Sequence, residues 1–293
     1  MKFGIAGNIE KKGLPAALDA LLRKFRSSGT PFVLDANLAK GIRKHHSALV
    51  RHAPTVAESR LAGSCEILIS LGGDGTMLRL ARLVGSTGTP ILGVNLGKLG
   101  FLAEVSPADI EPCLDEILRG DYRVEDRMLL EIQSPAMKRS SFALNDVVVD
   151  LAGSARMIDI ETHVDDQILA TFTGDGIIVS TPTGSTGYAL SNGGPIVTPN
   201  SKTILISPIC PHTLTARPVL VADSSVILLQ VHHAPAKVHV TVDGQPEQFF
   251  TSPVRFSIRK AGHTTRLVKR MNTGYYQVLR EKLRWGTDVR SKR

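Results

Sequence analysis

The sequence predicts an α/β domain followed by an all-β domain. Three observations lead to this fold class. The first 120 or so residues alternate apolar, strand-like runs with amphipathic helical segments. After residue 126 the pattern changes to short segments rich in β-branched residues. The chain also has 293 residues, which is enough for two ordinary domains.

Strand and helix signals alternate through the N-terminal part. Buried strands are predicted at 2–7 ("KFGIAG"), 30–35 ("TPFVLD"), 64–71 ("SCEILISL") and 89–95 ("TPILGVN"). Between the first two, apolar residues recur at helical spacing from Leu14 to Phe25, and Pro15 is tolerated in the first turn. Further helices are predicted from about Thr76 and from Ser106–Pro107.

Strands separated by helices predict a Rossmann-like parallel sheet with helices on its faces. Ligands of such sheets bind beyond the carboxyl ends of the strands. The stretch "ISLGGDGTML" (69–78) lies at such an end, because a strand runs directly into its glycines.

The C-terminal part reads as an all-β layered domain. Its predicted strands are "MLLEIQ", "ALNDVVVD", "MIDIETHV", "TILISP", "VILLQVH", "KVHVTVD" and "VRFSIRK". They are short and separated by Gly, Pro, Ser and Asp. We place the α/β domain at 1–124 and the all-β domain at 125–268. The C-terminal segment 269–293 is predicted to complete the first domain.

Composition narrows the class of protein. Hydrophobic residues make up 42% and charged residues 21%, which is typical of a globular protein, and no run is long enough for a membrane span. Three scattered cysteines fit neither a disulfide framework nor a zinc site. We therefore expect a cytoplasmic protein with no membrane partner and no protein-bound metal.

The net charge of +8 is compatible with nucleic acid or with acidic small molecules as partners. Much of this excess lies in the last fifteen residues, "LREKLRWGTDVRSKR". Aromatic residues are only 5% and do not alternate with Arg and Lys, as they would on a platform for single strands. We therefore expect anionic metabolites, and no nucleic acid, as partners.

The GGDGT stretch has the pattern of a phosphate site. A strand, a glycine turn and a helix N-terminus expose backbone N–H groups, so Gly72, Gly73, Gly75 and Thr76 are candidate phosphate-binding residues. Asp74 does not fit a plain phosphate site, since its charge repels the ligand. It suits a site where a divalent cation accompanies the phosphates, or where a base accepts a hydroxyl proton. The alternative is that Asp74 only caps the following helix.

A second candidate is "TGDGIIVSTPTGSTGYALSNGGPI" (173–196). It combines glycines with Ser and Thr hydroxyls, Asp175 and Tyr188, groups that suit a ligand rich in hydroxyls and phosphates. The alternative is an elaborate loop of the β domain without a ligand. Long ordered loops are usually functional, which favours a binding site.

These motifs resemble those of bacterial-type NAD kinases. "LGGDGTML", "ILGVNLGKLGFL", "LNDVVVD", "DGIIVSTPTGSTGYALSNGGPI", "TVDGQ" and "LREKLRW" occur in the order seen in that family. The likeness covers residues 67 to 285, and more loosely the first strand and helix. GGDGT is shared with other kinases, whereas TPTGST together with the Asn–Asp pair is specific to the family.

The resemblance implies transfer of the γ-phosphoryl group of ATP to the 2′-hydroxyl of the adenosine ribose of NAD, which gives NADP. It implies that Asp74 is the general base and that Asp74 and Gly75 form part of the NAD site. The 125–268 domain would hold most of the dinucleotide. The positions that match the family's NAD-binding residues are Asn145, Asp146, Arg156, Thr173, Asp175, Thr186, Gly187, Tyr188, Ala189, Leu190, Ser191 and Gln245.

The resemblance also implies Mg²⁺ or another divalent cation with ATP, and a homodimer or homotetramer. It leaves open whether the donor is ATP or polyphosphate. Three positions depart from the family pattern: Thr173, Gly187 and Asn192. Arg156 is equally compatible with a surface charge. Two alternative functions stay open on the residues alone: a GGDGT kinase that acts on lipid or sugar hydroxyls, and a non-catalytic sensor of NAD(P).

Overall fold

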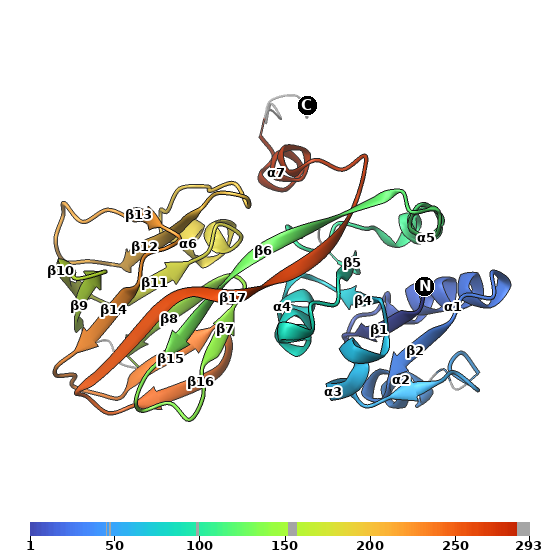
Figure 1. Cartoon of the computed structure of the whole chain (residues 1–293), viewed down its shortest axis with the longest axis horizontal. Helices are drawn as coiled ribbons and strands as arrows, with labels where there is room; N and C mark the ends of the chain where they lie inside the picture. The colour runs from blue at the N-terminus through green and yellow to red at the C-terminus, as the bar shows by residue number, and fades with distance from the viewer. Residues whose placement is uncertain (45, 47, 98–99, 152–156, 286–293) are drawn as a thin grey trace, which may run out of the picture. The chain divides into compact units, whose positions relative to one another are not determined.

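The computed structural model describes residues 1–44, 46, 48–97, 100–151 and 157–285, apart from the side chains of 246 and 247. The chain divides into two compact units (Figure 1). Unit 1 comprises Met1–Asp126 and Thr265–Arg293, and unit 2 comprises Arg127–Thr264. The two boundaries fall inside strands β6 (Tyr122–Gln133) and β17 (Val254–Arg270).

Unit 1 is built on a parallel sheet. Its strands are β1 (Phe3–Gly7), β2 (Phe32–Asp35), β3 (Thr55–Val56), β4 (Ile67–Gly72) and β5 (Ile91–Asn95). They lie in the order β5–β4–β1–β2–β3, and the C-terminal part of β17 joins β5 where Leu267 pairs with Ile91. All these pairs are parallel. The predicted Rossmann-like sheet is confirmed.

The helices of unit 1 are α1 (Leu14–Ser27), α2 (Ala36–Arg43), α3 (Glu58–Leu61), α4 (Asp74–Val84), α5 (Ile110–Arg119) and α7 (Tyr275–Leu283). In α1 the apolar residues at helical spacing from Leu14 to Phe25 are fully or nearly fully buried, and Pro15 occupies the first turn. Each such leucine or phenylalanine contributes roughly 1.5–3 kcal/mol by leaving water. The α2 helix, which was not predicted, begins where the Asp35 carboxylate caps the N–H groups of Asn37 and Leu38.

Unit 2 is a sandwich of antiparallel sheets. One layer holds β10 (Gln167–Gly174), β9 (Ile158–Val164), β14 (Ile227–Val231) and the N-terminal part of β17, with β6 paired to β17 and β7 (Ser141–Ala143) to β6. The other layer runs β13 (Val219–Ala222), β12 (Thr203–Ile209), β11 (Gly176–Ser180), β8 (Asp146–Leu151), β15 (Val238–Val242) and β16 (Gln245–Phe250). Side chains of both layers form one buried cluster. The predicted all-β layered fold is confirmed.

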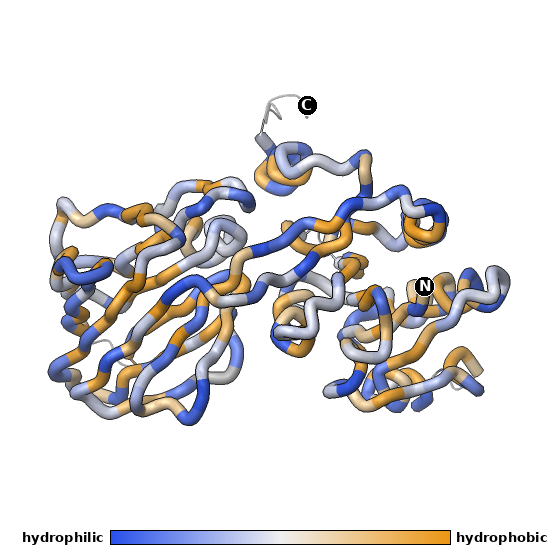
Figure 2. Tube along the Cα trace, viewed as in Figure 1, coloured by the Kyte–Doolittle hydropathy of each residue, from blue (hydrophilic) through white to orange (hydrophobic). Residues whose placement is uncertain are grey.

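Two burial patterns distinguish the strands of unit 2. In β14 and β15 buried and partly exposed residues alternate. Hydrophobic and hydrophilic stretches also alternate along the chain in this unit (Figure 2). Strands β11 and β12 are buried on both faces. The second face of their sheet is covered where Val148, Ile178 and Leu205 form a buried cluster with Ala189 of the short helix α6 (Tyr188–Ser191). This packing fixes α6 against the sheet.

Candidate active site

Helix α4 begins at the aspartate of the GGDGT motif. Asp74 is its first residue, and the preceding Gly73 has an extended backbone without a side-chain cap. The sequence placed the helix start at about Thr76, so that prediction was two residues late. Asp74 suits the first turn, because an acidic side chain is favoured near the positive N-terminal end of a helix.

The Asp74 carboxylate is bound by the loop that follows β5. Its Oδ2 accepts the N–H of Phe101 at 2.8 Å, and its Oδ1 accepts those of Leu102 at 3.1 Å and Ala103 at 3.2 Å. The carboxylate therefore binds the 101–103 backbone, and it is not the side-chain cap of α4. The side chain remains 29% exposed, so it is accessible to a ligand.

Gly100 permits this contact. A Cβ at position 100 would lie 2.0 Å from Asp74 Oδ1 and 2.7 Å from Asp74 Cγ. Any side chain there would displace the carboxylate. The backbone of Phe101–Ala103 thus holds Asp74 in place.

The candidate phosphate-binding residues separate into two groups. A Cβ at Gly72 would lie 2.1 Å from Thr76 Oγ1, and Thr76 is itself buried, so Gly72 is needed for packing within the protein. A Cβ at Gly73 or at Gly75 would meet nothing within 4 Å. These two glycines leave open space beside the first turn of α4, where the first N–H groups of a helix point away from its own carbonyls.

In unit 2 the residue pair Asn145–Asp146 is held by Asp243. The Asp243 carboxylate accepts the N–H groups of Leu144 at 2.9 Å, Asn145 at 2.7 Å and Asp146 at 3.1 Å. Asp243 and Gly244 both have positive φ and form the turn between β15 and β16. The "TVDGQ" motif therefore fixes the backbone of the "LND" motif almost 100 residues earlier, a role that the sequence prediction missed.

The TPTGST segment packs on the same backbone. Thr181 donates its hydroxyl to Leu144 O at 2.6 Å and accepts the N–H of Gly184 at 3.1 Å, while its own N–H bonds Asn145 O at 2.8 Å. A Cβ at Gly184 would lie 2.2 Å from Asn145 O. The segment approaches so closely that residue 184 must be glycine.

Gly187 lies beside two other residues that the sequence predicts for the NAD site. A Cβ at this position would lie 3.7 Å from Asn145 Nδ2 and 3.8 Å from Asp146 Oδ2. The two polar side chains therefore lie beside the turn that starts α6. At the other end of α6, Asn192 donates to Ser207 Oγ and to Pro208 O, which ties the helix to β12. This contact accounts for asparagine where the family pattern has a small residue.

The pKa values of two side chains near the start of α6 are raised. Burial, followed by the nearby Asp243 charge, raises the pKa of Asp146 from 3.8 to about 7. Asp146 therefore carries a proton for part of the time near neutral pH and can donate a hydrogen bond. Partial burial, followed by the charges of Asp150, Cys210, Asp175 and Asp146, raises the pKa of Tyr188. The Tyr188 ring is 48% exposed and offers an open aromatic face.

Asp175 and Thr173 lie at the end of β10. The Asp175 side chain hydrogen-bonds the Cys210 thiol, which raises the pKa of that thiol. The Asp175 charge also contributes to the raised pKa of Tyr188. The Thr173 hydroxyl donates to Asp159 at 2.5 Å, so its hydrogen bond is made within the sheet.

The remaining predicted residues have different surroundings. Thr186 forms a 3.3 Å hydrogen bond to Thr183 O. Ala189 is the fully buried residue of α6, and Leu190 and Ser191 complete that helix. Gln245 is partly buried and begins β16 directly after the Asp243–Gly244 turn. Arg156 lies outside the described residues.

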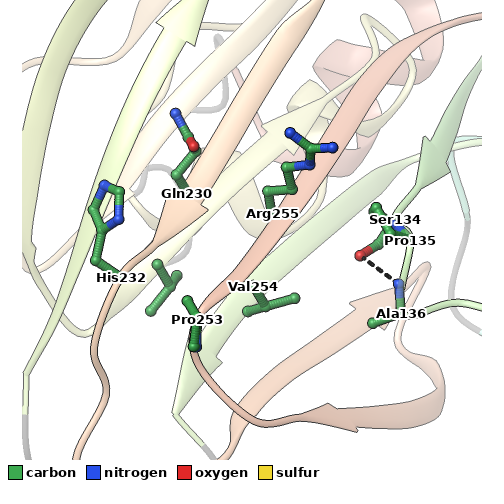
Figure 3. A pocket seen from close by; sticks show the side chains of 9 residues that line it. Ser134, Pro135, Ala136, Gln230, His232, Pro253, Val254 and Arg255 are labelled. Atoms are coloured by element: carbon green, nitrogen blue, oxygen red, sulfur yellow. Dashed lines mark hydrogen bonds between the residues drawn. The ribbon is translucent and has the colours of Figure 1, made fainter.

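Unit 2 also has a pocket of about 270 Å³ away from these residues. It lies on β14, β17 and the turn after β6. Gln230 and His232 line one side of it and Ser134–Ala136 the other, with Arg255 between them (Figure 3). These strands belong to the sheet opposite that of Asn145 and Asp146. The pocket includes no residue that the sequence predicts for the site. In the described part of the chain, no helix combines the length and apolarity needed to cross a bilayer.

Comparison with known proteins agrees with the motifs. The model of the ATP-NAD kinase N-terminal domain matches residues 34–122, and that of the ATP-NAD kinase C-terminal domain matches residues 144–270. An NAD kinase of Geobacter sp. (strain M21) is 41% identical over 293 residues, covering 97% of this chain and 99% of the relative. An NAD kinase of Heliobacterium modesticaldum is 43% identical over 249 residues, covering 84% and 88%.

Two solved structures are similar over most of the chain. An NAD kinase from Archaeoglobus fulgidus in complex with ATP superposes with a TM-score of 0.77 at 25% identity, covering 97% of this chain and 99% of that chain. Yeast NADH kinase complexed with NADH superposes with a TM-score of 0.87 at 24% identity, covering 100% and 90%. This second likeness supports the two-unit fold.

Proposed function

The chain belongs to the NAD kinase family, and we propose that it transfers the γ-phosphoryl group of ATP to the 2′-hydroxyl of the adenosine ribose of NAD, which gives NADP. The relatives named NAD kinase and the A. fulgidus structure with ATP support the two substrates. The observation that carries the proposal is the Asp74 carboxylate, which three backbone N–H groups fix. It lies next to Gly73 and Gly75, where the chain passes from β4 into α4; we call this turn the α4 corner.

Asp74 is the proposed general base. The ribose oxygen attacks the γ-phosphorus, the bond from that phosphorus to the β–γ bridging oxygen breaks, and ADP leaves. The proton of the hydroxyl passes to a carboxylate oxygen of Asp74. A positioned base typically contributes about 10²–10⁴-fold to the rate. Alignment and charge stabilisation supply the rest, since phosphoryl transfer leaves little covalent work to the protein.

Gly73 and Gly75 are the proposed contacts for the phosphates. Their open backbone lets phosphate oxygens approach the first N–H groups of α4, where the helix dipole also favours negative charge. Gly72 and Thr76 act indirectly in this proposal, because their close packing fixes the turn. A divalent cation such as Mg²⁺, bound together with ATP, would offset the charge of the phosphates. The Asp74 oxygens already accept N–H groups, which fits a cation carried by ATP.

Unit 2 is the proposed holder of NAD. Asn145 and the partly protonated Asp146 offer amide and carboxyl groups to sugar hydroxyls and to the base, and Tyr188 offers a ring face. Asp175 is the proposed contact for the nicotinamide half. Thr186 to Ser191 and Gln245 complete the proposed NAD site. Thr173 contributes through its bond to Asp159, which holds the end of β10.

Formation of NADP tests the reaction. Purified protein is incubated with NAD, Mg²⁺ and either ATP or polyphosphate, and NADP is measured by a cycling assay. We expect NADP with ATP. Phosphorylation of a lipid or sugar without NADP would instead support the alternative GGDGT kinase, and tight NAD binding without any product would support a sensor.

The Asp74→Asn variant tests the base. It keeps one acceptor oxygen for the loop, so we expect a folded protein that binds NAD while kcat falls about 10²–10⁴-fold. Asp115→Asn is the control, because Asp115 pairs with Lys24 on the surface of the same unit. If Asp74→Asn kept the kcat of the control, the assignment of the base would be wrong.

A further inference from the structure

The C-terminal helix α7 brings a cation to Asp74. Lys282 Nζ lies 3.5 Å from Asp74 Oδ2, although 208 residues separate them in the chain. Val278 and Leu279, four and three residues earlier, are buried and anchor the same face of the helix. Both α7 and Asp74 belong to unit 1, so this contact lies within one compact body.

Phe101 links the two charged groups. Its backbone N–H donates to Asp74 Oδ2 at 2.8 Å, and the Lys282 ammonium lies 4.3 Å from the centre of its ring. The ammonium therefore contacts both a carboxylate and an aromatic face, and a cation over a ring is attracted by the negative face of the ring. A lysine on a solvated helix face would have neither partner.

The Lys282 ammonium offsets the negative charge of Asp74 at the α4 corner. A carboxylate beside a phosphate site repels the phosphoryl donor. With Lys282 in place, the carboxylate and the ammonium sum to zero charge. Both side chains are about one-third exposed, at 29% and 31%, so solvent weakens the pair without abolishing it.

We propose that Lys282 is the counter-ion of Asp74 and that it sets the affinity of the protein for the phosphoryl donor. This inference rests on the proposed function, because it assumes that the donor phosphates bind at the α4 corner. Lys282 is a positioning residue in this role, since it acts through the Asp74 charge. It also gives the α7 helix, and with it the "LREKLRW" segment, a part in donor binding.

Four proteins test the charge balance through binding of Mg·ATP in the absence of NAD, measured by calorimetry at low ionic strength. The local charge is zero in the native protein, −1 in Lys282→Met, +1 in Asp74→Asn and zero in the double variant. We expect Lys282→Met to weaken binding about five- to tenfold, as for one partly screened charge, and Asp74→Asn to strengthen it. The double variant should return to within about twofold of the native value.

Two further variants separate charge from structure. Arg280→Met removes one positive charge from the exposed side of the same helix and should change the affinity less than about twofold. Lys282→Arg keeps the charge and should restore most of the affinity. The effect of Lys282→Met should also shrink as salt is added. Melting temperatures verify that each variant is folded, and Lys282→Gln replaces Lys282→Met if that protein does not fold.

The inference is overturned if Lys282→Met binds Mg·ATP like Arg280→Met, or if the double variant binds as weakly as Lys282→Met. It is also overturned if the native protein does not bind Mg·ATP. Because NAD and turnover are absent from this experiment, failure to form NADP would reject the proposed reaction separately. Normal NADP formation with unchanged donor affinity in Lys282→Met would reject the counter-ion alone.

Discussion

The Asp243 carboxylate holds the backbone of Asp146 while its charge acts on the Asp146 side chain. Asp243 Oδ1 accepts the Asp146 N–H at 3.1 Å, and the same carboxylate also binds the N–H groups of Leu144 and Asn145. Asp146 is only 7% exposed, so it lies close to a second acid with little water to screen the two. The geometry that orders the "LND" motif thus also favours the protonated form of its aspartate.

Asp146 should make the protein less stable as the pH rises. Its folded pKa of about 7 lies above the ordinary value of 3.8, so between these values the folded state binds more protons than the unfolded state. The stabilisation is complete below about pH 4 and is lost as the pH rises through about 7. It amounts to at most about 4 kcal/mol, from the three-unit shift. Urea unfolding at pH 5 and pH 8 measures the part that is lost between these values, about 3 kcal/mol.

The matched variant is Asp146→Asn, which cannot ionise. The fall in unfolding free energy from pH 5 to pH 8 should be smaller in this variant than in the native protein. Asp166→Asn, at an exposed turn, should keep the native difference. An identical pH dependence in the native protein and Asp146→Asn would show that Asp146 ionises normally.

Gly100→Ala should impair catalysis by moving Asp74. The new Cβ would start 2.0 Å from Asp74 Oδ1, so the carboxylate must shift and its bonds to the 101–103 backbone must weaken. A misplacement of about 1 Å can cost about 10²-fold in rate. Steady-state kcat for NADP formation is the measurement. Gly97→Ala is the control, since its nearest neighbours lie 3.9 and 4.0 Å away; equal kcat in both variants would contradict the prediction.

Thr181→Val should destabilise unit 2 although the change in side-chain volume is small. The two side chains have the same shape, but valine leaves Leu144 O and the Gly184 N–H without the buried hydroxyl that bonds both. We expect a loss of about 2–4 kcal/mol of unfolding free energy and weaker NAD binding. Thr186→Val removes one 3.3 Å bond at a partly buried site and should cost about 1 kcal/mol or less. Urea titration of both variants measures the loss of unfolding free energy. Equal losses in the two variants would contradict the role of the Thr181 hydroxyl.

Local sequence signals predicted the fold where burial has a clear period. The helical spacing from Leu14 to Phe25 predicted α1, and Ser106–Pro107 predicted a helical segment that begins with a 3₁₀ turn and continues as α5. Strand β11 was taken as part of a glycine-rich loop, because both of its faces are covered and its residues do not alternate. Strand β16 was missed because its identity depends on pairing with β15 across the Asp243–Gly244 turn.

The site was predictable only in its local motifs. GGDGT and TPTGST stand out as unusual runs of glycine and hydroxyl residues in the sequence. Their supporting contacts come from distant segments: Phe101 lies 27 residues from Asp74, Asp243 lies 97 from Asp146, and Lys282 lies 208 from Asp74. No local period marks such partners, since the fold alone brings them together.

Strand β17 has a consequence for biosynthesis. Its last residues supply the partner of β5, and with α7 they belong to the unit that the first 126 residues begin. During translation the first 126 residues emerge from the ribosome before Thr265–Arg293 is synthesised. Until the end of β17 is made, β5 is an unpaired edge of the sheet. Unit 1 can therefore complete its parallel sheet only after the end of β17 has been translated, although β1 is made more than 250 residues earlier.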